Sequence, residues 1–310
     1  MGHALRGWAI RSLGCLAVIL PLARGVAVAD DKSCDSIKQD YASKHDEVNA
    51  EVLNFLLFDA ADVGCKDLVE QFLAVGASVK GRNRIGNTAL IIAARSGHLD
   101  IVTLLLSRGA EVNYANLNGL TALVAAATKG RDDVVRALLD AGADLKLADG
   151  HGVTPLIAAG FAGDDAIARM LVQAGAKAGD IDTTGKSAIV YAAARGAAPF
   201  VQLMLDSGID VDQRYGNDLT ALMWAAGYAD DVKAADGLAT VELLLKKGAK
   251  LDLVDNRGRT ALMIAAELGR AAILETLLAR GANRAIVDKD GKRALDLAAN
   301  ESVREQLATR

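Results

Sequence analysis

The chain has 310 residues, of which 52% are hydrophobic and 24% charged, so it carries enough apolar side chains to build a folded core. Only 4% are aromatic, which predicts a core of Ala, Leu, Val and Ile. The formal net charge is −4, and without residues 1–29 the balance is 32 basic against 39 acidic side chains. A mildly acidic chain without basic clusters argues against binding to nucleic acid or to anionic membrane surfaces.

The N-terminus has the pattern of a secretory signal peptide. Two arginines within residues 6–11 precede an apolar run at 13–22, and residues 27–29, Ala-Val-Ala, form a small-x-small cleavage site. The run is about ten residues, too short for a bilayer, which needs roughly 20. We therefore expect cleavage after residue 29 and an exported, soluble chain without stable membrane insertion. Acylation of Cys15 and an uncleaved anchor remain as alternatives.

Residues 30–54 are predicted to form a polar N-terminal helical cap, followed by a divergent first repeat at 55–82. Two cysteines remain after residue 29, Cys34 and Cys65. In an oxidising exported compartment such a pair is a candidate disulfide. Two buried, unbridged thiols are the alternative.

From residue 88 onward the sequence repeats, with strings such as TALIIAARSG and TALVAAATKG. The starting residues are Thr88, Thr121, Thr154, Ser187, Thr220 and Thr260, and Arg293 opens a shortened last copy. The spacing is 33 residues except between the last two of the six, where it is 40. A regular period of this length is the signature of a repeat architecture.

Each copy has the features of a helical hairpin. The Thr or Ser is a helix N-cap, paired alanines allow close approach of a neighbouring helix, and a glycine ends the helix. A second helix follows, with apolar residues at helical spacing. Helices of about eight to ten residues are marginal alone, so the copies must stack into a solenoid.

The motif is clearest in Asp149-x-x-Gly152-x-Thr154-Pro155-Leu156, and in the run from Gly97-His98 to Gly109-Ala110-Glu111-Val112-Asn113. These residues resemble the ankyrin repeat family over about residues 55 to 310. The resemblance implies an all-α solenoid of about seven to eight helix-turn-helix units, caps included, joined by short hairpin loops. The expected repeats are 83–115, 116–148, 149–181, 182–214, 215–254 and 255–287, with a C-terminal capping repeat at 288–310.

The chain departs from the family at the histidine of the first helix. That position holds Ile91, Val124, Ile157, Val190, Met223 and Met263. We expect apolar packing to replace the hydrogen bonds that this histidine makes in the family.

Signals for catalysis are weak. Three histidines follow residue 29, at His45, His98 and His151, and they lie on different copies, while no metal, nucleotide or hydrolase motif is present. The turn aspartates, such as Asp149 and Asp182, are interpreted as side chains that bond nearby amides. We therefore predict no enzymatic activity, no cofactor and no metal site.

The resemblance implies that a partner protein binds at the hairpin tips and on the inner face of the first helices. The scarce aromatic residues fall on or beside these positions in consecutive copies, and aromatic residues are enriched at binding hot spots. The predicted partner-binding residues are Trp224, Tyr191, Phe161, Tyr228, Tyr215 and Asn217, with Trp224 and Tyr191 favoured. The alternative is that these rings only pack against neighbouring helices.

The repeat at 215–254 carries a seven-residue insertion, which is expected between Ala226 and Asp236, in the link between its two helices. A calcium loop would need carboxylates at its first, third and twelfth positions, which hold Val232, Ala234 and Leu243. The insertion is either a tolerated surface loop or an edge of the binding surface.

We expect a monomeric scaffold in the bacterial envelope, exported and periplasmic, that binds another protein. A secreted effector that engages host proteins is one alternative. A periplasmic protein that binds a small ligand or a metal is another.

Overall fold

The computed structural model describes residues 32–43 and 49–308. The predicted signal peptide, its cleavage after Ala29, the alternative at Cys15 and the position of His45 lie outside the described residues.

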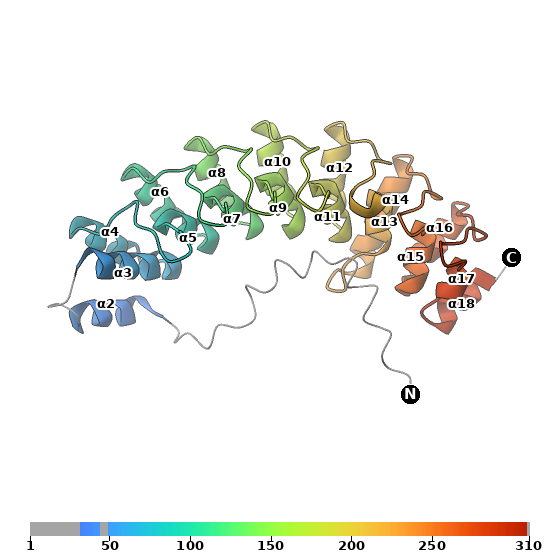
Figure 1. The fold of residues 1–310 in the computed structure, drawn as a ribbon, viewed down its shortest axis with the longest axis horizontal. Coiled ribbons are helices and arrows are strands. Elements are labelled where there is room, and N and C mark those ends of the chain that lie inside the picture. The colour runs from blue at the N-terminus through green and yellow to red at the C-terminus, as the bar shows by residue number, and fades with distance from the viewer. Residues whose placement is uncertain (1–31, 44–48, 309–310) are drawn as a thin grey trace.

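The described chain is a curved row of helix pairs (Figure 1). First helices lie along the inner side of the curve and second helices along the outer side, while α2 lies beside α3 at the N-terminal end. The pairs are α3 (Ala50–Val63) with α4 (Lys66–Ala74), α5 (Ala89–Ser96) with α6 (Leu99–Ser107), α7 (Ala122–Thr128) with α8 (Asp132–Asp140), and α9 (Pro155–Ala162) with α10 (Asp165–Gln173). They continue with α11 (Ala188–Ala194) and α12 (Ala198–Asp206), α13 (Ala221–Ala226) and α14 (Ala234–Lys246), α15 (Ala261–Glu267) and α16 (Ala271–Ala279), and α17 (Ala294–Leu297) and α18 (Glu301–Ala308). The all-α solenoid prediction is confirmed.

The first helices begin where the sequence predicts. The hydroxyls of five threonines accept a hydrogen bond from the amide three residues later, at 3.2 to 3.4 Å. These threonines are Thr88, Thr121, Thr154, Thr220 and Thr260. Ser187 is the exception, because its hydroxyl makes no such bond at the start of α11.

Apolar packing replaces the expected histidine in the first helices. The six residues at that position, Ile91, Val124, Ile157, Val190, Met223 and Met263, are all buried. The paired alanines of the first helices are buried as well, and each first helix contacts the next one along the row. Small side chains thus allow the closely spaced inner row that forms the core.

Hairpin loops between the pairs are joined into a ladder. The amide of Gly150 donates to the carbonyl of Asn118 at 2.6 Å, and the amide of Thr183 donates to that of His151 at 2.9 Å. Within each turn except the one that begins at Tyr215, an Asn or Asp side chain accepts from backbone amides, as predicted for the turn aspartates. The residues in this role are Asn83, Asn116, Asp149, Asp182, Asp255 and Asp288.

The N-terminal cap is α2 (Cys34–Ser43), joined to the first pair by a disulfide between Cys34 and Cys65. The Cα atoms are 5.6 Å apart. Ile37 is buried, and the Tyr41 ring meets the edge of Phe72 with centroids 5.3 Å apart. The helix α3 begins at Ala50, so it crosses the expected boundary between cap and first repeat.

The insertion differs from its expected position in the link. The link covers residues 227–233, and α14 begins at Ala234 and has 13 residues, whereas α6, α8, α10, α12 and α16 have nine. Part of the inserted sequence therefore extends the second helix at its N-terminus. None of the helices described between residues 32 and 308 is long and apolar enough to cross a membrane.

Candidate partner-binding surface

The structure buries most of the aromatic residues predicted to contact a partner. Tyr191 is 5% exposed, Trp224 3%, Tyr228 6% and Tyr215 8%, while Phe161 is half-buried and Asn217 exposed. The first four residues therefore follow the alternative, in which the rings pack within the stack. Each ring lies against neighbouring repeats, as Phe161 and Tyr191 show with ring centroids 3.8 Å apart. Asn217 keeps an exposed place at a hairpin tip.

These residues nevertheless meet where the repeat pattern breaks down, at the junction between the fifth repeat (182–214) and the sixth (215–254). Tyr215 stands where the other hairpins have Asn or Asp, and Asp218 where they have Gly. Asn217 and Asp218 have φ of 64° and 61°, and they are the only non-glycine residues with positive φ in the described chain. A short 3₁₀ turn, η3 (Gly216–Asp218), forms here.

The hairpin ladder shifts by one residue at this junction. Following the other hairpins, the amide of Gly216 would donate to the carbonyl of Thr184, but it donates to that of Gly185 at 2.8 Å. The ordinary register returns at the next loop, where the amide of Asn256 donates to the carbonyl of Asn217 at 3.0 Å. The fifth and sixth hairpins therefore meet in an arrangement that the rest of the solenoid does not use.

A lysine is buried beside this irregular loop. Lys186, directly before the N-cap Ser187 of α11, is 5% exposed. Its Nζ lies 5.4 Å from the centroid of the Trp224 ring and 6.0 Å from that of Tyr191. Over the described residues, no carboxylate forms an ion pair with it.

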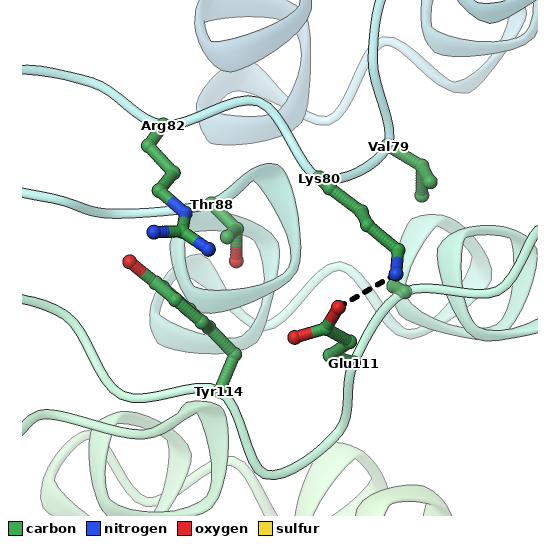
Figure 2. A pocket seen from close by; sticks show the side chains of 7 residues that line it. Val79, Lys80, Arg82, Thr88, Glu111 and Tyr114 are labelled. Carbon is green, nitrogen blue, oxygen red and sulfur yellow. Dashed lines mark ion pairs between the residues drawn. The ribbon is translucent and has the colours of Figure 1, made fainter.

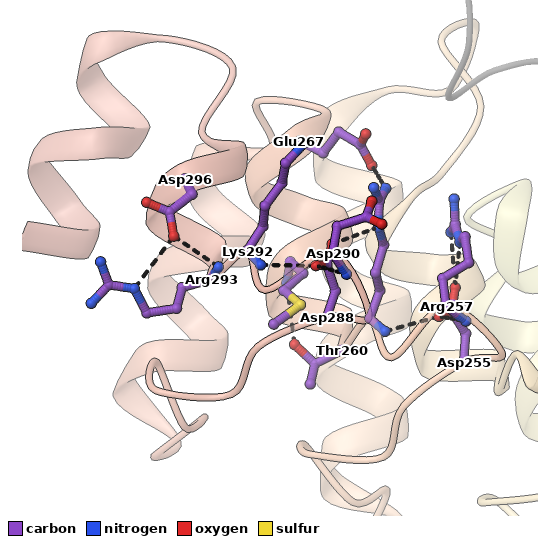
Figure 3. A network of polar contacts seen from close by, with 11 residues as sticks. Asp255, Arg257, Thr260, Glu267, Asp288, Asp290, Lys292, Arg293 and Asp296 are labelled. Carbon is purple, nitrogen blue, oxygen red and sulfur yellow. Dashed lines mark hydrogen bonds and ion pairs between the residues drawn. The ribbon is translucent and has the colours of Figure 1, made fainter.

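The equivalent residue two repeats later shows what Lys186 lacks. Arg259 forms an ion pair with Glu267 and lies 3.4 Å from a carboxylate oxygen of Asp288 (Figure 3). Glu267 lies seven residues after the N-cap Thr260, and Asp288 is the turn residue of the next hairpin. At the junction, the same two positions hold Ala194 and Tyr215. The fifth repeat therefore has a cation at this position but no carboxylate at either of the two positions that pair with Arg259.

The nearest turn carboxylate, Asp182, is occupied by other donors. Its Oδ1 accepts from the backbone amides of residues 184 and 186 and from the Thr184 hydroxyl. Its Oδ2 accepts from the Tyr191 hydroxyl at 2.5 Å. Asp182 thus holds the turn and the ring of Tyr191 in place.

Three further polar groups at the junction are buried without a hydrogen-bond partner in the described chain: the Ser187 hydroxyl, the Tyr215 hydroxyl and the Trp224 indole N–H. Burial raises the pKa of Tyr215, and the nearby Ser187 hydroxyl opposes that rise, although the two groups do not complete a hydrogen bond. Each group can donate a hydrogen bond. The indole N–H and the Lys186 amine only donate, whereas the two hydroxyls can also accept, so the groups at the junction carry an excess of donors.

The inserted link is held by arginines from both sides. Arg195 donates to the Asp231 carboxylate at 2.7 Å and to the Phe161 carbonyl at 2.9 Å. Arg270 donates to the Tyr228 carbonyl at 2.9 Å and to Asp230 at 2.7 Å. The hydrogen bond from Arg195 lowers the pKa of Asp231. These contacts fix the link as an ordered part of the stack.

Tyr228 is the packed centre of that link. The Arg270 guanidinium lies 3.9 Å from the centroid of its ring. On the other side lies Gly237, where an added Cβ would come within 2.4 Å of a ring carbon. Glycine is therefore required at this position of α14 for the ring to fit.

A small hollow lies at the other end of the solenoid, between the second and third hairpins (Figure 2). Lys80 pairs with Glu111 at 2.7 Å, and Arg82 stacks on Tyr114 at 4.4 Å. The hydrogen bond from Lys80 lowers the pKa of Glu111. The enclosed space is about 10 Å³, room for roughly one water molecule. It is too small for an organic ligand.

Metal-ligating side chains are scattered. Within residues 32–43 and 49–308, no three His, Cys, Asp or Glu side chains are grouped so that they could hold a metal ion. His98 instead bonds the Asp62 carbonyl of the preceding repeat, with 2.9 Å between its Nε2 and the oxygen.

The model of a known family, described as ankyrin repeats (3 copies), matches residues 31–116, 57–149, 114–182, 156–236 and 231–308. The chain belongs to the ankyrin repeat family. Ankyrin repeats generally act as protein–protein interaction modules, and the fold is typically non-enzymatic.

Solved ankyrin repeat structures include a close match in fold. The crystal structure of the human ASB11 ankyrin repeat domain superposes with a TM-score of 0.65 and 30% sequence identity. The match covers 71% of this chain and 96% of that domain. It supports the stacked arrangement of this ankyrin repeat protein.

A curated relative shares a short part of the repeat region. It is a probable palmitoyltransferase, AKR2, of Saccharomyces uvarum, 46% identical over 59 residues. The match covers 19% of this chain and 7% of that enzyme. The similarity is thus confined to ankyrin repeats.

Sequence reasoning missed Lys186. The signal was present in the repeat alignment, at the residue before each N-cap. Its members are Asn87, Leu120, Val153, Lys186, Leu219, Arg259 and Lys292. A lysine at a position that is apolar in both adjacent repeats indicates a special role. Only the stacked structure showed that no carboxylate pairs with Lys186, because part of its surroundings comes from the neighbouring repeat.

Proposed function

We propose that this protein is a monomeric, non-enzymatic interaction module that binds a partner protein through the hairpin tips and first helices of its fifth and sixth repeats. We place it in the bacterial envelope, exported to the periplasm. The main observation behind this proposal is that several departures from the repeat pattern lie together at the junction between the fifth and sixth repeats. A repeat that serves only for stacking has no reason to lose its turn residue, its turn glycine and its link length together.

Two features of the same repeat support this reading. Thr220 still caps α13, and Ala225 and Ala226 are still buried, so the sixth repeat keeps its place in the stack. The inserted link is held by Arg195 and Arg270 and is ordered. The departures therefore lie on a well-folded scaffold, which suits a binding surface.

The proposed location has two supports. Residues 1–29 have the signal-peptide pattern, and the pairing of Cys34 with Cys65 suits an oxidising compartment. Fractionation of the producing cells tests the location. Recovery from the periplasmic extract is expected, whereas recovery from the culture medium would favour the secreted effector.

Site-specific crosslinking tests the binding surface. A photoreactive amino acid replaces Asn217 at the tip of the sixth-repeat hairpin, and in a second protein it replaces Asn118. Both asparagines are exposed and occupy the same position of their repeats, so Asn118 is the matched control. Irradiation in the native envelope is expected to join a defined partner to position 217 and not to position 118.

The partner is then identified by mass spectrometry and its binding is repeated with purified proteins. Equal crosslinking from both positions, or crosslinking from position 118 alone, would place the binding surface elsewhere. Removal of Trp224 or Tyr191 would be a poor test, because both side chains are buried and their loss would disturb the stack.

A further inference from the structure

The junction between the fifth and sixth repeats has an excess of positive charge and of hydrogen-bond donors. Lys186 is buried without a carboxylate partner, and the Ser187 and Tyr215 hydroxyls and the Trp224 N–H are buried unpaired in the described chain. A cation at the end of a largely buried side chain is unfavourable without an ion-pair partner, and so is an unpaired buried donor. Such a combination is relieved by an anionic group that accepts hydrogen bonds.

We propose that Lys186 anchors an acidic side chain, Asp or Glu, of the partner protein. The inference rests on the proposed function and names the chemistry of the partner at that site. A similar arrangement exists within the stack, where Arg259 at the equivalent position forms ion pairs with Glu267 and Asp288. At Lys186 both positions lack a carboxylate, and the partner supplies one.

The aromatic rings around Lys186 explain how its side chain stays buried when no partner protein is bound. A lysine amine above Trp and Tyr rings is attracted to the ring faces, which offsets part of the cost of burial. The rings carry no negative charge, so they do not neutralise the amine as a carboxylate would. The site is therefore tolerable when empty and more stable when a carboxylate is bound.

Exposed loop residues flank Lys186 on the hairpin side. Thr183 and Thr184 on one loop and Asn217 on the next are exposed. The lysine side chain has four rotatable bonds, so its amine can turn toward an arriving carboxylate. Asp182 forms no ion pair with the amine in the described chain; its Oδ1 accepts from two backbone amides and the Thr184 hydroxyl, and its Oδ2 accepts from the Tyr191 hydroxyl.

Fluorescence of Trp224 provides a direct readout. The chain has two tryptophans, Trp8 and Trp224, so the Trp8→Phe protein reports on the junction alone, whether or not its first residues are removed. The probe is tetraglutamate, acetylated at its N-terminus and amidated at its C-terminus. Acetylated and amidated tetraglutamine is the neutral control.

The expected result is a saturable change in Trp224 emission with tetraglutamate and none with tetraglutamine. Lys186→Leu is expected to weaken binding of tetraglutamate about 10-fold or more, because a charge-assisted hydrogen bond is lost. Lys186→Arg restores it. Lys129→Leu removes the same charge from an exposed position of the third repeat and leaves binding unchanged. Circular dichroism verifies that each variant is folded.

Two results would overturn the assignment: no saturable change with tetraglutamate, or equal binding by the Lys186→Leu variant. A third probe, acetylated tetra-alanine with a free C-terminus, distinguishes a terminal carboxylate from an acidic side chain. Binding of that peptide alone would overturn the choice of a side chain.

The partner found by crosslinking separates this inference from the proposed function. If this partner binds the Lys186→Leu variant as tightly as the unmodified protein, the proposed function is supported, and the proposal that Lys186 anchors an acidic side chain is wrong. If no partner crosslinks to position 217, the proposed function fails, whatever the peptides show.

Discussion

The turn residues of the hairpins show how single side chains set the local backbone. Six hairpins place a glycine at the last turn position, with φ between 74° and 81°. These glycines are Gly86, Gly119, Gly152, Gly185, Gly258 and Gly291. The sixth repeat has Asp218 there, with φ of 61°. A side chain in this region costs roughly 1 kcal/mol, somewhat less for Asp than for most residues.

Replacement of this aspartate should therefore stabilise the protein. Asp218→Gly is expected to raise the free energy of unfolding by about 0.5 to 1 kcal/mol, measured by urea denaturation, because the strained side chain is removed. The reciprocal control is Gly291→Asp, where an added Cβ meets nothing within 4 Å and only the positive φ is tested. It should lower the stability by a similar amount. A destabilising Asp218→Gly change would show that the aspartate makes a compensating contact.

At the scale of elements, the inserted link and the longer α14 form one unit with the arginines that flank them. Arg270 makes two kinds of contact, an ion pair with Asp230 and contacts with the carbonyl and the ring of Tyr228. The side chain of Asp230 is 73% exposed, so its ion pair is worth at most about 1 kcal/mol. The buried contacts with Tyr228 must carry most of the stabilisation.

This difference predicts unequal effects of two substitutions. Arg270→Ala should cost about 2 kcal/mol of stability and increase amide hydrogen exchange over residues 227–236, because the carbonyl bond and the stacking on Tyr228 are lost. Asp230→Asn should cost less than about 0.5 kcal/mol. Similar losses from both substitutions would assign the main role to the ion pair.

At the scale of the whole molecule, each pair of helices contacts its neighbours in the row, so damage should stay local. The N-terminal end is the clearest case. The disulfide joins α2 to the first pair across 31 residues of sequence, and closing such a loop is worth roughly 3 to 4 kcal/mol. The remaining contacts of α2 include the buried Ile37 and the Tyr41 edge on Phe72.

Reduction of the disulfide is expected to loosen α2 alone. Amide exchange over residues 34–43 should rise roughly 100-fold, because a local opening becomes easier by about 3 kcal/mol, while exchange in the third to seventh repeats stays unchanged. Mass spectrometry before and after reduction establishes the bridge, and a Cys34→Ser variant repeats the effect without reductant. Free thiols in protein from the oxidising compartment would contradict the bridge, and loss of protection along the whole stack would contradict the local response.

The sequence alone determined the helix pairs, their 33-residue period and their caps, because these depend on chemistry within a few residues. A threonine hydroxyl reaches the amide three positions later, and a turn aspartate bonds its own loop. The tertiary structure decided what depends on packing: the burial of Trp224 and Tyr191 between helices, the start of α14 within the insertion, and the absence of an ion pair at Lys186. These features depend on contacts between neighbouring helices and repeats, such as those of Trp224 with Lys186 and of Tyr191 with Phe161, which only the stacking brings together.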